Sequence, residues 1–270
     1  MDTQIISLSN QKGGVGKTTT CANLGIGLAR EGKRVLLVDC DPQASLTLSL
    51  GWRKPETLPV TLATLMGRVL QEQPVHAEEA ILHHAEGVDL IPGSIALSGV
   101  EASLDTRQNV LKRVLDDCRK DYSHVLLDCM PSLGMMTINA LAATDGIVVP
   151  TIPQHLPTKG IEKLLESVHQ VRRGINPSLK IEGILMTLMD GRTVYEREIS
   201  EMIRKAYGGK INIFGTEIPR SVRAAETSAE GKSIFAYAPR SKVAEAYRQL
   251  TKEVLALEKQ REEHRAEIGR

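Results

Sequence analysis

A glycine-rich run near the start of the chain sets the strongest limit on what it can fold into. Residues 10–19 read Asn-Gln-Lys-Gly-Gly-Val-Gly-Lys-Thr-Thr, directly after the apolar segment Ile5–Ser9 and before a helical pattern. Three glycines allow a tight turn in which successive backbone N–H groups point at one anion. A helix that begins near Lys17 adds the positive end of its dipole at the same place. The run therefore predicts a strand, a phosphate-binding loop and a helix, which is the start of an α/β fold.

Two lysines flank the small residues of this loop. Lys17 is expected to reach the β- and γ-phosphates of a nucleotide, and the Thr18 hydroxyl to bind Mg²⁺. The usual pattern, G-x-x-x-x-G-K-[ST], has glycine where this chain has Gln11, and Lys12 follows as a second cation. The alternative is a turn without a ligand, but it does not explain two lysines around four small residues. The expected nucleotide-binding residues of the loop are Lys12, Gly13, Gly14, Val15, Gly16, Lys17, Thr18 and Thr19.

Three aspartates follow two other apolar runs. Asp39 and Asp41 come after one run, and Asp128 comes after Val125–Leu127. Because ligands of open α/β sheets bind outside the carboxyl ends of the strands, all three carboxylates can converge on the phosphate loop. An acid there can hold Mg²⁺, directly or through water, or orient an attacking water. Any one of these aspartates alone has the alternative of a helix cap or turn former.

Short apolar runs alternate with helical patterns along the chain, as in proteins built from βαβ units. Several runs, such as Val35–Val38, are continuously apolar, which is typical of strands covered on both faces. We therefore expect one domain over 1–270, with a single doubly wound, mostly parallel sheet and helices on both faces. The expected strands are Ile5–Ser9, Arg34–Asp39, Val88–Pro92, His124–Asp128, Gly146–Pro150, Ile181–Thr187 and Ile211–Phe214. The expected helices include Thr18–Arg30, Arg107–Lys120, Thr158–Arg172, Thr193–Tyr207 and a long C-terminal helix, Lys242–Arg265, at about 240–265.

The composition argues against several classes of protein. Lys and Arg number 34 and Asp and Glu number 33, so the net charge of +1 marks no whole-chain nucleic-acid surface. The four cysteines contain no C-x-x-C pair, which disfavours zinc ribbons and iron–sulfur sites, and we expect Cys40 and Cys129 to fill the core. No apolar run approaches the roughly 20 residues of a membrane span. We expect a cytoplasmic protein, with His83 and His84 facing different directions on a helix and binding no metal.

Five motifs together resemble one family. They are K-G-G-V-G-K-T-T at 12–19, L-L-V-D-C-D-P-Q at 36–43, V-L-L-D-C-M-P-S-L-G at 125–134, Ile184–Thr193 and Ile218–Gly231. This set resembles the deviant Walker A ATPases of the ParA/Soj/MinD superfamily and is most similar to its small, Soj-like partition ATPases. The resemblance covers nearly the whole chain, and the last two motifs separate this branch from the rest of the superfamily.

The resemblance implies a dimeric switch that uses ATP and Mg²⁺. By this likeness, Lys12 reaches the partner's phosphates across an ATP-sandwiched homodimer, and Asp41 orients the hydrolytic water. With Lys17 in its ordinary role, these are the implied catalytic residues. Thr18, Asp39 and Asp128 would lie at Mg²⁺, and Pro219 would mark the adenine site.

The same resemblance implies DNA binding through arginines that match Arg192 and one of Arg220 and Arg223. Plain surface charge is the alternative reading of these arginines. The phosphate loop begins at residue 12, so we expect no N-terminal helix-turn-helix domain, and hence sequence-independent, nucleoid-associated DNA binding through phosphates. The implied partner is a ParB-like protein that stimulates hydrolysis and moves a DNA cargo.

The chain departs from the family pattern at a few positions. Met130 replaces a usual proline, Ser221 stands where asparagine is common, and Ala225–Ala229 lacks a usual proline. Two other functions stay open: a superfamily ATPase that positions a protein cargo, and a P-loop ligase or kinase similar to dethiobiotin synthetase. Lys12 argues against the second, because such enzymes need no lysine acting on a partner. The mixed-charge C-terminal helix also shows no bulky apolar face of the MinD membrane-targeting type, so we expect no membrane partner.

Overall fold

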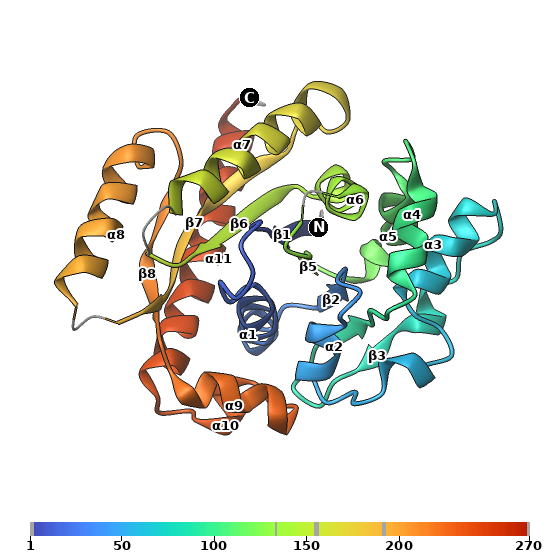
Figure 1. Ribbon diagram of the computed structural model, residues 1–270, viewed down its shortest axis with the longest axis horizontal. Helices are drawn as coiled ribbons and strands as arrows, with labels where there is room; N and C mark the ends of the chain where they lie inside the picture. Colours follow the sequence, from blue (N-terminus) through green and yellow to red (C-terminus); the bar gives the residue numbers. More distant parts are fainter. Residues whose placement is uncertain (1–2, 133, 154–156, 191–192, 269–270) are drawn as a thin grey trace.

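The computed structural model describes residues 3–132, 134–153, 157–190 and 193–268. Eight strands form one sheet in the order β3-β4-β2-β5-β1-β6-β7-β8 (Figure 1). Every neighbouring pair is parallel except β3 and β4, which are antiparallel. The strands are β1 (Gln4–Leu8), β2 (Val35–Asp39), β3 (Leu82–His83), β4 (Asp89–Ile91), β5 (His124–Asp128), β6 (Gly146–Thr151), β7 (Lys180–Met189) and β8 (Ile213–Pro219).

Helices cover both faces of this sheet. They are α1 (Lys17–Arg30), α2 (Ser45–Ser49), α3 (Leu62–Leu70), α4 (Leu97–Leu104), α5 (Val110–Cys118), α6 (Met135–Ala143), α7 (Pro157–Gly174), α8 (Val194–Tyr207), α9 (Val222–Glu230), α10 (Ile234–Tyr237) and α11 (Lys242–Ile268). On one face, α1 and α11 pack in a single apolar cluster with strand residues such as Leu8 and Leu126. On the other face, two further clusters bring α3, α5 and α6, and then α7 and α8, against the sheet. The expected doubly wound α/β fold is confirmed.

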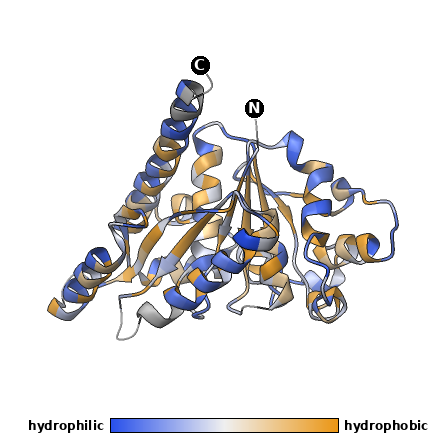
Figure 2. Cartoon of the chain, turned by 90° about the horizontal axis from the view of Figure 1, so that it is seen from above, coloured by the Kyte–Doolittle hydropathy of each residue, from blue (hydrophilic) through white to orange (hydrophobic). Residues whose placement is uncertain are grey.

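The continuously apolar strands follow from this layering. In β2, Val35 and Leu37 belong to the cluster under α1 and α11, whereas Leu36 and Val38 belong to the cluster under α3 and α5. Because successive side chains of a strand point to opposite faces, a sheet covered on both sides needs apolar residues at every position. Figure 2 shows the result, with hydrophobic residues gathered on the strands and hydrophilic ones on the outer sides of the helices.

All seven expected strands are present, but the last one ends later than its sequence predicts. We expected Ile211–Phe214, and β8 instead runs from Ile213 to Pro219. Glu253 of α11 accepts hydrogen bonds from the backbone N–H groups of Gly215 and Thr216 at 2.9 and 2.8 Å. The Glu253 carboxylate therefore satisfies backbone N–H groups at the edge of the sheet. Sequence periodicity within 211–219 does not reveal this contact with another helix.

The expected helical position of His83 is wrong. His83 ends the two-residue edge strand β3, and its Nδ1 lies 2.6 Å from Oδ1 of Asp89 on β4. His84 follows the strand, with its ring 5.9 Å from that of Trp52. A strand this short has no measurable period, and only pairing with β4 defines it. The helix expected at Arg107–Lys120 is also shorter, since α5 ends at Cys118 and a 3₁₀ turn follows over Arg119–Asp121.

Within the described ranges, no helix is both long enough and apolar enough to cross a membrane.

Candidate functional site

The loop between β1 and α1 has the backbone that its glycines allow. Gly14 and Gly16 have φ values of 69° and 81°, in the left-handed region that side chains disfavour. Gly16 is also the N-cap of α1, so the first N–H groups of the helix face the loop. Unpaired N–H groups and the helix dipole together make this loop a site for an anion such as a phosphate.

Residues from two neighbouring strands hold the loop in place. The Asn10 amide donates to the backbone oxygen of Pro150 at 2.7 Å, and its own oxygen accepts from the N–H of Lys12 at 3.0 Å. On β7, the buried Thr187 hydroxyl donates to the backbone oxygen of Val15 at 2.8 Å. Sequence reasoning missed both supports, because each joins segments more than 130 residues apart and only strand order brings them together.

The two lysines of the loop lie in different surroundings. The Lys17 side chain is buried, and its Nζ donates to the backbone oxygen of Lys12 at 3.2 Å. Burial lowers the pKa of Lys17, against the opposing effect of Asp128 and Asp41 nearby. The Lys12 side chain is exposed at the surface of the loop. The two lysines of the loop therefore differ in burial, with Lys17 inside the loop and Lys12 at its surface.

The three aspartates converge beside the loop, as their strand-end positions predict. Asp39 and Asp128 are register partners on the adjacent strands β2 and β5, and both are fully buried. Burial raises the pKa of each carboxyl, and the negative charge of Asp39 raises that of Asp128 further. Two acids held this close in the interior need a cation if both are to be ionised.

Asp39 and Asp128 nevertheless differ in their hydrogen bonds. Asp39 accepts from both the N–H and the hydroxyl of Thr47, at 2.8 and 2.7 Å, and from the N–H of Asp41 at 3.2 Å. Among the described residues, neither oxygen of Asp128 has a hydrogen-bond partner of good geometry, although the Thr18 hydroxyl and Lys17 lie near enough to lower its pKa. An unsatisfied buried carboxylate is unusual in a folded protein and indicates a missing ligand.

Mg²⁺ fits these residues. The cation prefers hard oxygen ligands and commonly takes one or two from the protein, with phosphates and water completing six. Thr18 and Asp128 offer such oxygens beside the loop. No cluster of three or more His, Cys, Asp or Glu residues suited to a metal occurs in the described part of the chain.

Asp41 has a third kind of surroundings. Its side chain is half-buried, and its Oδ1 accepts from the N–H of Gln43 at 2.9 Å. The carboxylate therefore keeps contact with solvent at the edge of the site, in contrast to Asp39 and Asp128.

The two cysteines that follow the strand-end aspartates lie in the core. Cys40 and Cys129 are 1% and 2% exposed, and burial raises the pKa of both thiols, that of Cys129 to about 12. Thiols that stay protonated are poor nucleophiles. Their position agrees with the expected role as core fillers.

Three of the residues expected to contact adenine or DNA lie around the C-terminal end of β8. Pro219 is the last residue of β8 and pairs with Met189 of β7. Arg220 and Arg223 are exposed, at and near the start of α9. Arg192 falls outside the described residues. The sequence therefore places two of its three candidate arginines on one exposed segment.

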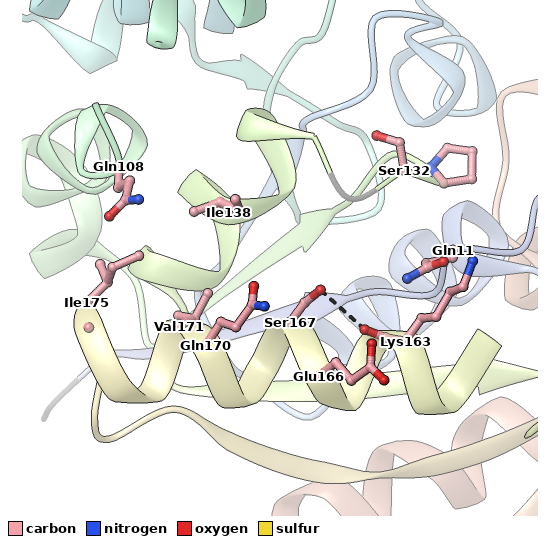
Figure 3. Close-up of a pocket in the computed structure, with 12 residues that line it drawn as sticks. Gln11, Gln108, Ser132, Ile138, Lys163, Glu166, Ser167, Gln170, Val171 and Ile175 are labelled. Carbon is pink, nitrogen blue, oxygen red and sulfur yellow. Dashed lines mark hydrogen bonds between the residues drawn. The ribbon is translucent and has the colours of Figure 1, made fainter. Parts of the chain in front are cut away.

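A cleft of about 710 Å³ lies beside the phosphate loop, between α6 and α7 (Figure 3). Gln11 of the loop and Ser132, which follows β5, line one end, and Gln108 and Ile175 line the other. Sequence reasoning did not find this cleft, because its walls come from four separate segments that carry no common motif.

Known proteins resemble this chain over most of its length. A family model described as an AAA domain matches residues 3–181. The chain is 41% identical over 256 residues to the sporulation initiation inhibitor protein Soj of Bacillus subtilis, with 94% of this chain and 98% of that protein covered. It is 43% identical over 251 residues to the chromosome-partitioning ATPase Soj of Thermus thermophilus, with 93% and 95% covered. The chain belongs to the ParA/Soj family of partitioning ATPases.

A solved structure of similar fold supports the nucleotide and the metal of this ParA-type ATPase. A Mycobacterium smegmatis protein, named cobyrinic acid a,c-diamide synthase and solved with an ATP analogue and magnesium, is 36% identical. It superposes with a TM-score of 0.80 over 94% of this chain and 95% of that one. ATP and Mg²⁺ are therefore consistent with the loop and the carboxylates described above.

Proposed function

We propose that this ATPase is a dimeric switch that binds DNA without sequence preference and uses ATP hydrolysis to drive DNA segregation with a ParB-like partner. The main observation in support of this proposal is that Lys12 is exposed on a loop that already contains the buried Lys17. A second cation at the outer surface of the loop suits a phosphate bound by another copy of the chain. The relatives named as chromosome-partitioning proteins support DNA as the cargo.

In this proposal the chain's own groups divide the work. The loop N–H groups and Lys17 bind the phosphates, and Asp41 orients the attacking water. Mg²⁺, when bound at Thr18 with Asp128 and Asp39 beside it, neutralises charge on the phosphates. Lys12 of each copy offsets charge on its partner's transferring phosphoryl group, so turnover requires the dimer. We infer slow turnover by the protein alone and faster turnover with DNA and the ParB-like partner, on the nucleoid within the cytoplasm.

Lys12→Ala is expected to keep most nucleotide binding by the monomer and to lose ATP-dependent dimerisation and turnover. The reason is that Lys17 and the loop backbone stay in place, whereas the cation directed at the partner is removed. ATP affinity by titration calorimetry, dimerisation by size-exclusion chromatography and phosphate release test this. Lys54→Ala, which removes an equally exposed lysine from a surface loop, is the matched control. A Lys12→Ala protein that dimerises and hydrolyses ATP normally contradicts the role in the partner's site.

Arg192→Glu, and one of Arg220→Glu and Arg223→Glu, are expected to weaken ATP-dependent DNA binding at least about tenfold while leaving ATP affinity unchanged. Each substitution replaces an attractive charge near DNA phosphates with a repulsive one. Arg223→Glu, made separately, decides which of Arg220 and Arg223 contacts DNA. Arg113→Glu, on the exposed side of α5, is the control for a change of net charge. Wild-type affinity should also fall steeply with salt and be alike for unrelated DNA sequences. Binding that responds to neither salt nor these substitutions would place the DNA surface elsewhere.

A second candidate, an ATP-dependent amide-forming ligase, is favoured by the name of the Mycobacterium smegmatis structure. Such an enzyme activates a carboxylate of its substrate with ATP and needs no lysine from a partner. The two functions are separated by what raises ATP turnover. DNA with a ParB-like protein raises it under our proposal, whereas a corrinoid acid with an amine donor raises it for a ligase.

A further inference from the structure

An irregularity interrupts the pairing of β7 with β8 directly beside the phosphate loop. Met186 pairs with Glu217 and Met189 pairs with Pro219, so Thr187 and Leu188 together oppose the single residue Ile218. Leu188 has a φ of 53°, in the left-handed region that a leucine rarely adopts. Two residues opposite one, with an unusual backbone conformation, define a β-bulge.

The bulge changes which face of the sheet the end of β7 presents. Met186 and Met189 belong to the same apolar cluster although they are three residues apart, whereas Leu185 belongs to the cluster on the opposite face. In a regular strand, residues three apart point to opposite faces. Regular alternation places Thr187 on the face of Leu185, where its hydroxyl meets the phosphate loop. The extra residue then returns Met189 to the face of Met186.

Thr187 fixes one peptide unit of the loop. Thr187 is 1% exposed, and its hydroxyl donates to the backbone oxygen of Val15 at 2.8 Å. Because a trans peptide is planar, its C=O and N–H point in opposite directions. Holding the oxygen of Val15 toward β7 therefore holds the N–H of Gly16 toward the other side of the loop, among the groups available to a phosphate.

The other end of the bulge is tied to the exposed arginine segment. The backbone oxygen of Met189 accepts from the N–H of Arg220 at 2.9 Å. The N–H of Asp190 donates to the Glu196 carboxylate of α8 at 2.5 Å. Thr187, Leu188 and Met189 thus form a continuous path from the phosphate loop to the first residue after β8, beside α8 (Figure 1).

We propose that this bulge transmits the state of the phosphate loop to the Arg220 segment, with Thr187 as the positioning residue at the loop. A leucine rarely adopts the left-handed conformation of Leu188, so this residue is the point at which a small shift of Thr187 becomes a change of backbone conformation. Occupancy of the loop then orders the Met189–Arg220 pair. The inference rests on the proposed function, because it gives that function the link between ATP and the DNA-binding arginines.

The test is amide hydrogen exchange on the full chain with Mg²⁺ and a non-hydrolysable ATP analogue, without DNA. In the wild type, the analogue is expected to slow exchange at least about threefold in peptides covering 186–190 and 217–223. Thr187→Val removes the hydroxyl with little change of shape, and it is expected to weaken analogue affinity about tenfold, the scale of one buried hydrogen bond. Even when the analogue saturates the Thr187→Val protein, amide hydrogen exchange at residues 217–223 should not be slowed. Thr187→Ser, which keeps the hydroxyl, should restore both properties.

Two more variants separate coupling from general loss of stability. Thr144→Val removes a comparable buried bond, from the Thr144 hydroxyl to the backbone oxygen of Ala140 at 2.7 Å, away from the loop. It should behave like the wild type in both measurements. Leu188→Gly keeps the Thr187 hydroxyl but frees the bulge, so analogue affinity should stay within about threefold while protection at 217–223 is lost.

Three results overturn the proposal: no protection in the wild type, wild-type protection in saturated Thr187→Val, or wild-type protection in Leu188→Gly. The third applies even if Thr187→Val does not fold or bind. The proposed function has a separate readout, which is DNA binding by the wild-type protein in the presence of ATP. A wild type that does not bind DNA under these conditions contradicts the proposed function, whatever the exchange experiment shows.

Discussion

Lys17→Ala is expected to abolish nucleotide binding, the largest effect of any single substitution considered for this ATPase. Lys17 is the buried lysine of the loop, and its ammonium lies within reach of the electrostatic influence of Asp128. Removing it takes away the contact with the β- and γ-phosphates and leaves the buried pair Asp39 and Asp128 facing a polyanion. Lys12 is exposed, and we do not expect it to replace the buried ammonium.

Titration calorimetry with ATP and Mg²⁺ measures this effect directly. Lys17→Gln, which keeps a polar side chain one atom shorter than lysine and without its charge, should fail in the same way. Thermal unfolding of both variants shows whether the fold is intact. Lys12→Ala is the matched control, because it removes the neighbouring lysine and should retain binding by the monomer. Near-normal ATP affinity in a folded Lys17→Ala protein contradicts the assignment of the phosphate loop.

Asp41→Ala is expected to separate binding from chemistry. Nucleotide and metal would still be held by the loop backbone, Lys17 and Thr18, so the ATP-bound dimer should form. Hydrolysis should fall by about two to four orders of magnitude, the usual scale for the loss of a group that positions a reacting water. The trapped dimer should then stay on DNA after free ATP is removed, whereas the wild type dissociates.

Asp41→Asn is the sharper companion variant. The Asp41 carboxylate accepts from the N–H of Gln43 at 2.9 Å, and an asparagine oxygen can accept the same bond. If the charge orients water, Asp41→Asn should be nearly as slow as Asp41→Ala, as phosphate release and size-exclusion chromatography with ATP would show. A fully active Asp41→Asn enzyme would assign Asp41 to the turn alone. Failure of Asp41→Ala to dimerise would make it structural or metal-binding and pass the catalytic role to Asp39 or Asp128.

Local sequence predicted the parts of this molecule whose conformation is decided within a few residues. Gly14 and Gly16 take positive φ values because a phosphate loop needs them, and only glycine adopts them without strain. Apolar runs such as Val35–Val38 became strands covered on both faces. The approach of Asp39 to Asp128 was also predictable, because parallel strands bring their carboxyl ends to one edge of the sheet.

Only the tertiary structure decided which hydrogen bonds the strand-end residues make and which elements contact one another. Asp39 and Asp128 end similar strands, but only Asp39 meets a donor pair, on Thr47, because α2 packs over β2. The extension of β8 involves Glu253 of α11, and the phosphate loop is supported by a hydrogen bond from Thr187 of β7 to Val15. These contacts join different secondary-structure elements, 8, 38 and 172 positions apart in the chain, and they leave no period or spacing in the sequence. The sequence by itself therefore determined the fold class and the phosphate loop. The packing of elements against one another decided which of the two strand-end carboxylates is hydrogen-bonded and what supports the loop.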